Sequence, residues 1–161
     1  MNLPKSRLTL TAAFLIAFAA AGILPAHAAE TTLHGEGRYT ANRRPFTLAN
    51  GEQVVLMSNY GVASMATPGS TTVPELVQFH CGAMGLLSKD NQFNFDVYCS
   101  MSASDKDAID FKGTGNSDLV KVTVIGGKGR WQGATGSGTI TAQKQDGTAD
   151  AFAYEFKITT P

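Results

Sequence analysis

The sequence of 161 residues predicts an all-β fold, a single eight-stranded antiparallel up-and-down β-barrel that follows a cleaved signal peptide. Three observations predict it. Apolar and polar residues alternate along eight segments, turn residues separate these segments, and no stretch of about twelve residues carries apolar side chains at helical spacing. A barrel is expected because closure removes the exposed edges that an open sheet of this size would leave.

Residues 1–28 are expected to be a secretory signal peptide that lies outside the fold. Lys5 and Arg7 form a positive amino-terminal region, an apolar and alanine-rich segment covers residues 8–24, and Ala26-His27-Ala28 has the small-x-small pattern of a cleavage site. A retained membrane anchor is the alternative, but the apolar run is short and is interrupted by Thr and Gly. The sequence therefore predicts a periplasmic or secreted protein whose barrel domain, residues 29–161, has no membrane span.

Eight strands are expected in the mature chain. They cover residues 32–41, 53–65, 76–87, 93–102, 108–113, 119–126, 138–145 and 149–159. Asp146-Gly147 predicts the tightest hairpin, a type I′ turn that sets Gln145 opposite Thr148.

Cys81 and Cys99 lie on the two strands of one predicted hairpin, whose polar turn covers residues 88–92. Folding this hairpin about Asp90 sets the two cysteines directly opposite each other on the same apolar face, which predicts a disulfide. The same register pairs Phe79 with Met101, Ala83 with Val97 and Gly85 with Phe95. The alternatives are a redox-active pair and a metal site, but the spacing is not Cys-x-x-Cys and few other soft ligands remain.

The apolar phase of each strand is expected to face the barrel interior. On the second strand this phase is assigned to Val54, Leu56 and Tyr60. Seven of the inward aromatic residues are the candidate ligand-binding residues: Tyr39, Tyr60, Phe79, Phe95, Phe111, Tyr154 and Phe156. Charged residues fall on the outward phase, so no catalytic residue, metal ligand or cofactor is predicted, and tyrosine hydroxyls are the polar groups expected inside.

Small residues also fall on the inward phase, at Gly35, Gly37, Ala83 and Gly85. Two interpretations stay open. The small residues leave a void for a ligand, or they only compensate for large neighbours in a close-packed core.

A glycine-rich segment surrounds the only tryptophan, between two segments expected to be strands. Its residues resemble the turn signature of the allene oxide cyclase and dirigent-type barrels: Gly126, Gly127, Gly129, Trp131, Gly133, Ala134 and Gly136. The resemblance implies an eight-stranded barrel, trimeric in plant members, whose apolar lumen binds small hydrophobic molecules or steers their cyclisation or coupling. Other motifs of these families are not evident, so no catalytic residue is carried over.

Charge limits the class of partner. The leader contains two of the 13 basic residues and no acid, which leaves 11 bases against 13 acids in the mature chain, a net charge of −2 with neutral His. This balance argues against a nucleic-acid partner.

Three functions remain, and the first is favoured. The lumen binds a small apolar ligand, of fatty-acid or polyphenol type, without covalent chemistry. Alternatively, the protein is a cofactor-free cyclase or isomerase, or a barrel that acts through its surface, where residues 66–75 form the candidate loop.

Overall fold

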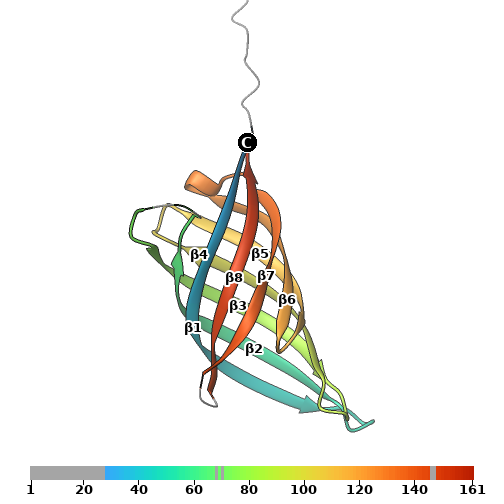
Figure 1. Cartoon of the computed structure of the whole chain (residues 1–161). Helices are drawn as coiled ribbons and strands as arrows, with labels where there is room; N and C mark the ends of the chain where they lie inside the picture. Colours follow the sequence, from blue (N-terminus) through green and yellow to red (C-terminus); the bar gives the residue numbers. More distant parts are fainter. Residues whose placement is uncertain (1–27, 68, 70, 146–147) are drawn as a thin grey trace, which may run out of the picture.

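The computed structural model describes residues 28–67, 69, 71–145 and 148–161, which form one closed antiparallel barrel (Figure 1). Each strand pairs with its neighbour in sequence, and β1 closes the barrel against β8. The predicted fold class is therefore confirmed. The strands are β1 (Ala29–Thr47), β2 (Gln53–Met65), β3 (Glu75–Leu87), β4 (Phe93–Ser102), β5 (Ala108–Asn116), β6 (Leu119–Lys128), β7 (Thr135–Gln145) and β8 (Thr148–Thr160).

The first strand is longer than predicted. β1 continues past Ala41 to Thr47 and pairs with β2 over that whole length, including Pro45 opposite Val55. The pairing of β1 with β8 ends at Arg38, so the last part of β1 has one paired side in the described chain. Because an edge strand needs hydrogen bonds on one side only, it accommodates Pro45.

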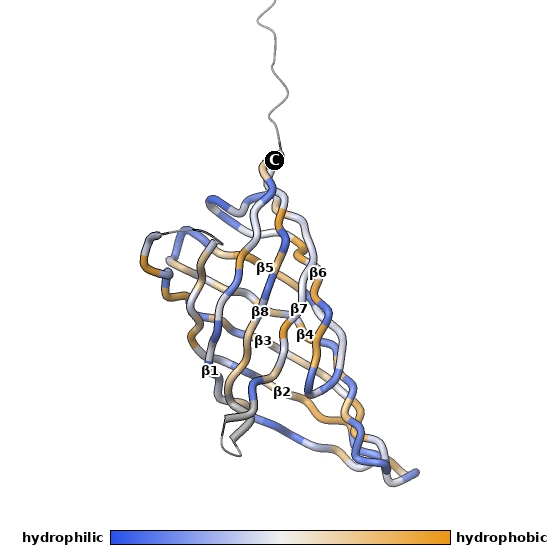
Figure 2. Tube along the Cα trace, viewed as in Figure 1, coloured by the Kyte–Doolittle hydropathy of each residue, from blue (hydrophilic) through white to orange (hydrophobic). Residues whose placement is uncertain are grey.

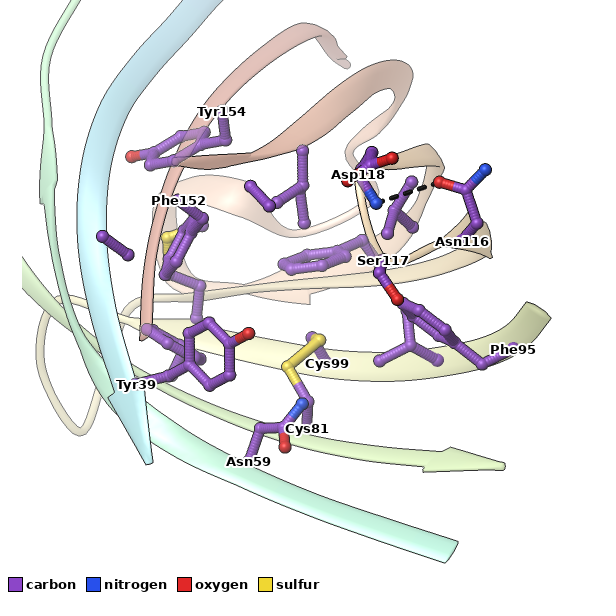
Figure 3. Close-up of a pocket in the computed structure, with 18 of the residues that line it drawn as sticks. Tyr39, Asn59, Cys81, Phe95, Cys99, Asn116, Ser117, Asp118, Phe152 and Tyr154 are labelled. Carbon is purple, nitrogen blue, oxygen red and sulfur yellow. Dashed lines mark hydrogen bonds between the residues drawn. A yellow bond between two sulfur atoms is a disulfide. The ribbon is translucent and has the colours of Figure 1, made fainter. Parts of the chain in front are cut away.

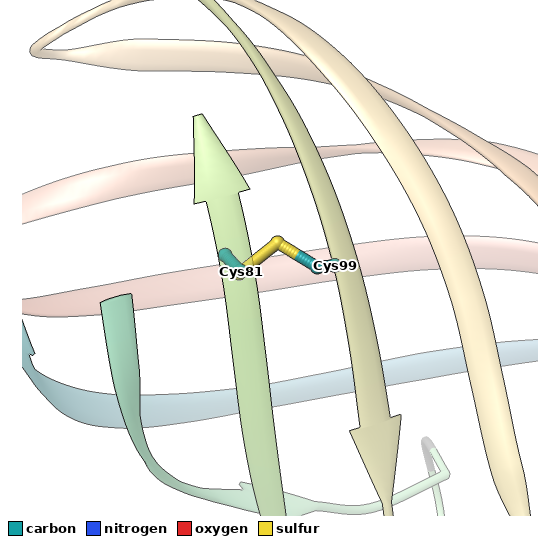
Figure 4. Close-up of a disulfide and its surroundings, with 2 residues drawn as sticks. All are labelled: Cys81 and Cys99. Carbon is teal, nitrogen blue, oxygen red and sulfur yellow. A yellow bond between two sulfur atoms is a disulfide. The ribbon is translucent and has the colours of Figure 1, made fainter. Parts of the chain in front are cut away.

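The hairpin of β3 and β4 has the predicted register. Cys81 lies opposite Cys99, Phe79 opposite Met101, and Gly85 opposite Phe95. A disulfide joins Cys81 to Cys99, whose Cα atoms are 4.1 Å apart (Figure 4). Gln145 also lies opposite Thr148 as predicted, while the Asp146-Gly147 turn lies outside the described residues.

The inward phase predicted for β2 is wrong. Tyr60 is 48% exposed and Leu56 is 41% exposed, whereas Val55 and Ala63 are buried. Apolar residues occupy four consecutive positions from Val54 to Met57, so alternation gives no direction there. The pairing with β3 decides it, because Asn59 lies opposite the inward Cys81 and Gly61 opposite the inward Phe79, whose ring lies 2.9 Å from the position of a Cβ on Gly61.

Elsewhere the alternation follows the prediction. Figure 2 shows hydrophobic and hydrophilic positions alternating along the strands. The charged residues predicted to face outward are exposed, apart from a half-buried Asp110: His34, Glu36, Arg38, His80, Asp96, Asp110, Lys112, Lys121, Glu155 and Lys157. Apart from Tyr154, no residue with a polar or charged side chain is fully buried among residues 28–67, 69, 71–143 and 151–161.

The two ends of the barrel differ. The short 3-10 helix η1 (Gly129–Trp131) lies at the end where the chain terminates, and the β1–β2 and β3–β4 turns lie at the other end (Figure 1). Near η1 the interior is densely filled, and the most completely buried side chains include Ile109, Ile158 and Val77. The lumen is thus closed at the η1 end, and any opening must lie toward the hairpin turns.

The glycine-rich turn carries η1. Gly129 has φ 63°, and a Cβ there would meet Asp107 Oδ1 at 2.1 Å, so both its backbone angle and its surroundings require glycine. Asp107 Oδ1 accepts a hydrogen bond from the N–H of Arg130 at 3.0 Å. Trp131 is only 9% exposed, so its ring is buried at this end of the barrel.

Across residues 28–67, 69, 71–145 and 148–161, no helix has the length and apolar character needed to cross a membrane.

Candidate functional site

The barrel interior contains a cavity of about 110 Å³ that reaches the β5–β6 turn. Its wall is mainly aromatic and aliphatic, and the Cys81–Cys99 disulfide forms part of it (Figure 3). Asn116, Ser117 and Asp118 of the turn are exposed and form its polar rim. The lumen is therefore partly hollow and opens at the hairpin end.

Six of the seven predicted candidate residues line this cavity: Tyr39, Phe79, Phe95, Phe111, Tyr154 and Phe156. Tyr60 does not, because β2 directs it to the outer surface. Phe152, which was not among the candidates, completes the aromatic wall. The structure thus brings the six residues together, and their role in ligand binding stays a prediction.

The small inward residues do not create the cavity. A Cβ on Gly37 would meet the Phe152 ring at 2.5 Å, and a Cβ on Gly85 would meet the Phe93 ring at 2.6 Å. At Gly35 the backbone oxygen of Ser64 is 1.9 Å from the position a Cβ would take. Around these glycines the close-packed interpretation is correct, and a larger residue at Gly85 would clash instead of filling a pocket.

The aromatic side chains form a connected cluster. Phe79 and Phe152 pack edge to face with ring centroids 5.1 Å apart, and Tyr154 and Phe156 lie 4.9 Å apart. Phe111 contacts Phe156 at 5.1 Å. Because each ring is held by its neighbours, the wall is preformed and a ligand would not have to order it.

Tyr154 contributes a ring to the cavity while its hydroxyl is engaged elsewhere. The hydroxyl donates a hydrogen bond to the backbone oxygen of Ser64 at 2.8 Å. Burial raises the pKa of Tyr154 well above its ordinary value, because the charged phenolate would lose its hydration. Tyr154 therefore stays neutral over the physiological pH range.

Asn59 is a polar residue of the wall that the sequence analysis missed. It lies opposite Cys81 in the β2–β3 register, so its side chain shares the inward face with the disulfide. Its Oδ1 atom is buried and has no hydrogen-bond partner in the described structure. The incorrect phase of β2 hid this residue, and pairing β2 with the cysteine strand is the step that finds it.

Asn116, the other asparagine of the lining, already has hydrogen-bond partners within the protein. Asn116 Oδ1 accepts hydrogen bonds from the N–H groups of Asp118 and Leu119, both at 3.0 Å, and so shapes the β5–β6 turn. Asp118 is the one charged residue among the described residues that line the cavity. The described residues contain no group of three or more His, Cys, Asp or Glu side chains placed to hold a metal ion.

No protein-family model and no curated protein matches this chain. Among solved structures, pyocyanin demethylase aligns with a TM-score of 0.48 and 14% identity over 81% of this chain and 99% of that one. A pterocarpan synthase dirigent protein aligns with a TM-score of 0.44 and 13% identity over 82% of this chain and 88% of that one. These values describe similarity of shape and say nothing about shared chemistry.

Fold and site together define a closed eight-stranded β-barrel with a preformed, largely apolar lumen that is open at one end. This is the architecture implied by the resemblance of the glycine-rich turn to the allene oxide cyclase and dirigent-type barrels.

Proposed function

We propose that the mature protein is exported to the periplasm or the medium and there binds a small apolar ligand in its lumen without covalent chemistry. The observation that carries the proposal is the cavity itself, an open apolar space whose aromatic wall is already in place. Protein interiors are normally packed as densely as organic crystals, so an unfilled interior space of this kind supports binding of a ligand there.

The volume limits the ligand. The cavity measures about 110 Å³, and a dry apolar cavity of about 150 Å³ in another protein takes up benzene. The smaller volume here limits the part of a ligand inside the lumen to at most a single ring or a short alkyl group. A fatty acid or a polyphenol would have one such group in the lumen and the rest outside, across the rim at Asn116 and Asp118.

The state of the polar groups favours binding over turnover. The Tyr154 hydroxyl is held by Ser64 and kept neutral by burial, so it is a poor acid or base. Asp118 is exposed on the rim, at the β5–β6 turn. A cyclase that only shapes a reactive substrate stays the alternative, and product analysis in the binding experiment separates the two.

The export part of the proposal is supported by the disulfide, since such bonds persist mainly in oxidising compartments. The leader that would direct export falls on residues 1–28, almost all of which lie outside the described residues.

Binding of toluene to the lumen can be tested by ligand-observed NMR. The variant Ala142→Leu places a larger side chain in the cavity wall and is expected to abolish uptake. Ala153→Leu is the matched control, because Ala153 lies on the outer face of β8, outside the cavity lining. This variant is expected to bind toluene like the wild type.

Toluene uptake that is lost only in Ala142→Leu supports lumen binding. Equal uptake by all three proteins places the ligand elsewhere, and no uptake by the wild type contradicts the proposal. The absence of covalent chemistry is tested by incubating the protein with small apolar epoxides. A covalently altered product would favour the cyclase alternative.

A further inference from the structure

Asn59 places an amide group in the inner wall of the cavity. Asn59 Oδ1 is buried without a partner in the described part of the chain, whereas Asn116 on the rim has its Oδ1 bonded twice. An amide in an apolar wall is costly unless its polar atoms find partners, so the amide atom that faces the lumen is the one that a ligand can pair.

The orientation of the amide decides which group that is. Figure 3 shows the Asn59 nitrogen on the side of the Cys81–Cys99 disulfide and of the cavity, and the oxygen on the far side. An Nδ2 amide group is a hydrogen-bond donor. A ligand that extends to this point would therefore present an acceptor to Asn59.

Charge decides whether the acceptor on the ligand is ionised or neutral. Asp118 is the one charged residue in the described lining, and it is acidic. A ligand carboxylate would lose its hydration in the lumen and meet no cation there, so an ionised acceptor is disfavoured. A neutral acceptor, such as a carbonyl or an ether oxygen, carries no such cost.

We infer that Asn59 is the specificity-determining residue of the lumen and that Nδ2 donates a hydrogen bond to a neutral carbonyl-type acceptor on a single-ring ligand. This inference rests on the proposed function, and it excludes a fatty-acid carboxylate as the buried group.

The test uses acetophenone and α-methylstyrene, two neutral molecules of nearly equal shape that differ in C=O against C=CH₂. Their affinities are measured by NMR titration for the wild type, for Asn59→Leu, and for Asn94→Leu, a control on the outer face of β4. The ratio of acetophenone to α-methylstyrene affinity is expected to fall about fivefold in Asn59→Leu, as loss of one hydrogen bond predicts, and to stay unchanged in Asn94→Leu.

A second readout is the side-chain NH₂ signal of Asn59, assigned by its absence from the spectrum of Asn59→Leu. It is expected to move downfield with acetophenone and not with α-methylstyrene. An affinity ratio that is unchanged in Asn59→Leu, with both probes still bound, overturns this inference and leaves lumen binding intact. Failure of both probes to bind the wild type overturns the proposed function and the inference together.

Discussion

Two inward polar side chains, Tyr154 and Asn59, show how differently single residues can meet the cost of burial. The Tyr154 hydroxyl is paired with the backbone of Ser64, so its polar atom strengthens the contact between β8 and β2. Asn59 Oδ1 has no such partner in the described structure. At this scale Tyr154 stabilises the fold, and Asn59 is the residue for which we propose a role in function.

Tyr154→Phe is expected to lower the free energy of unfolding by ~1 kcal/mol near neutral pH, because one buried hydrogen bond is lost. Burial raises the pKa of Tyr154, so above pH ~10 the unfolded chain releases this proton while the folded protein keeps it. Wild-type stability should therefore fall with rising pH in that range, and the variant should lack this part of the loss. Urea unfolding at about pH 8 and about pH 11 measures both effects.

Tyr98→Phe is the matched control for the hydrogen bond, because Tyr98 is 62% exposed on the outer face of β4. Its free energy of unfolding at the lower pH should equal that of the wild type. A Tyr154→Phe variant as stable as the wild type would contradict the assigned bond.

Among the elements, the glycine-rich turn that carries η1 has the clearest structural role. Arg130 forms an ion pair with Glu75 at the start of β3, and Asp107 holds the Arg130 backbone. Trp131 joins the buried core from this turn. The turn therefore closes one end of the barrel and leaves the hairpin end as the entrance to the lumen.

Trp131→Ala is expected to destabilise the protein by about 3 to 5 kcal/mol, the usual cost of removing a buried aromatic side chain. Because Trp131 is the only tryptophan, fluorescence of the wild type reports this site alone, and acrylamide should quench it weakly. The control Tyr98→Ala removes an exposed ring and should stay within about 0.5 kcal/mol of the wild type. Efficient quenching in the folded wild type would contradict the burial of this ring.

At the scale of the whole molecule, the barrel is closed and its disulfide is consistent with an extracellular or periplasmic location. The barrel has no open sheet among its eight strands, apart from the far part of β1, and the one disulfide spans adjacent strands. The homotrimer implied by the family resemblance stays a prediction, as does cleavage of the leader.

The exported protein is expected to begin at Ala29 and to be lighter than its reduced form by two hydrogens. Intact-mass analysis of periplasmic and medium fractions, before and after reduction, measures both. Ala28→Arg, which removes the small residue at the cleavage site, should accumulate as the full-length precursor. Recovery of wild type in the cytoplasm with residues 1–28 intact would contradict export.

Much of this protein follows from local sequence patterns. Alternation defines the strands, and the hairpin about Asp90 sets Cys81 opposite Cys99, because side-chain direction in a strand has a period of two and a short turn sets the register. Six of the seven candidate lumen residues follow from the same rule. Only the tertiary structure decides the phase of β2, where consecutive apolar residues carry no direction and the pairing with β3 sets Asn59 opposite Cys81 and Gly61 opposite Phe79. The phase of β2 places Tyr60 outside the barrel and Asn59 inside it. The cavity depends on how rings from several strands pack together, which cannot be predicted from any single segment.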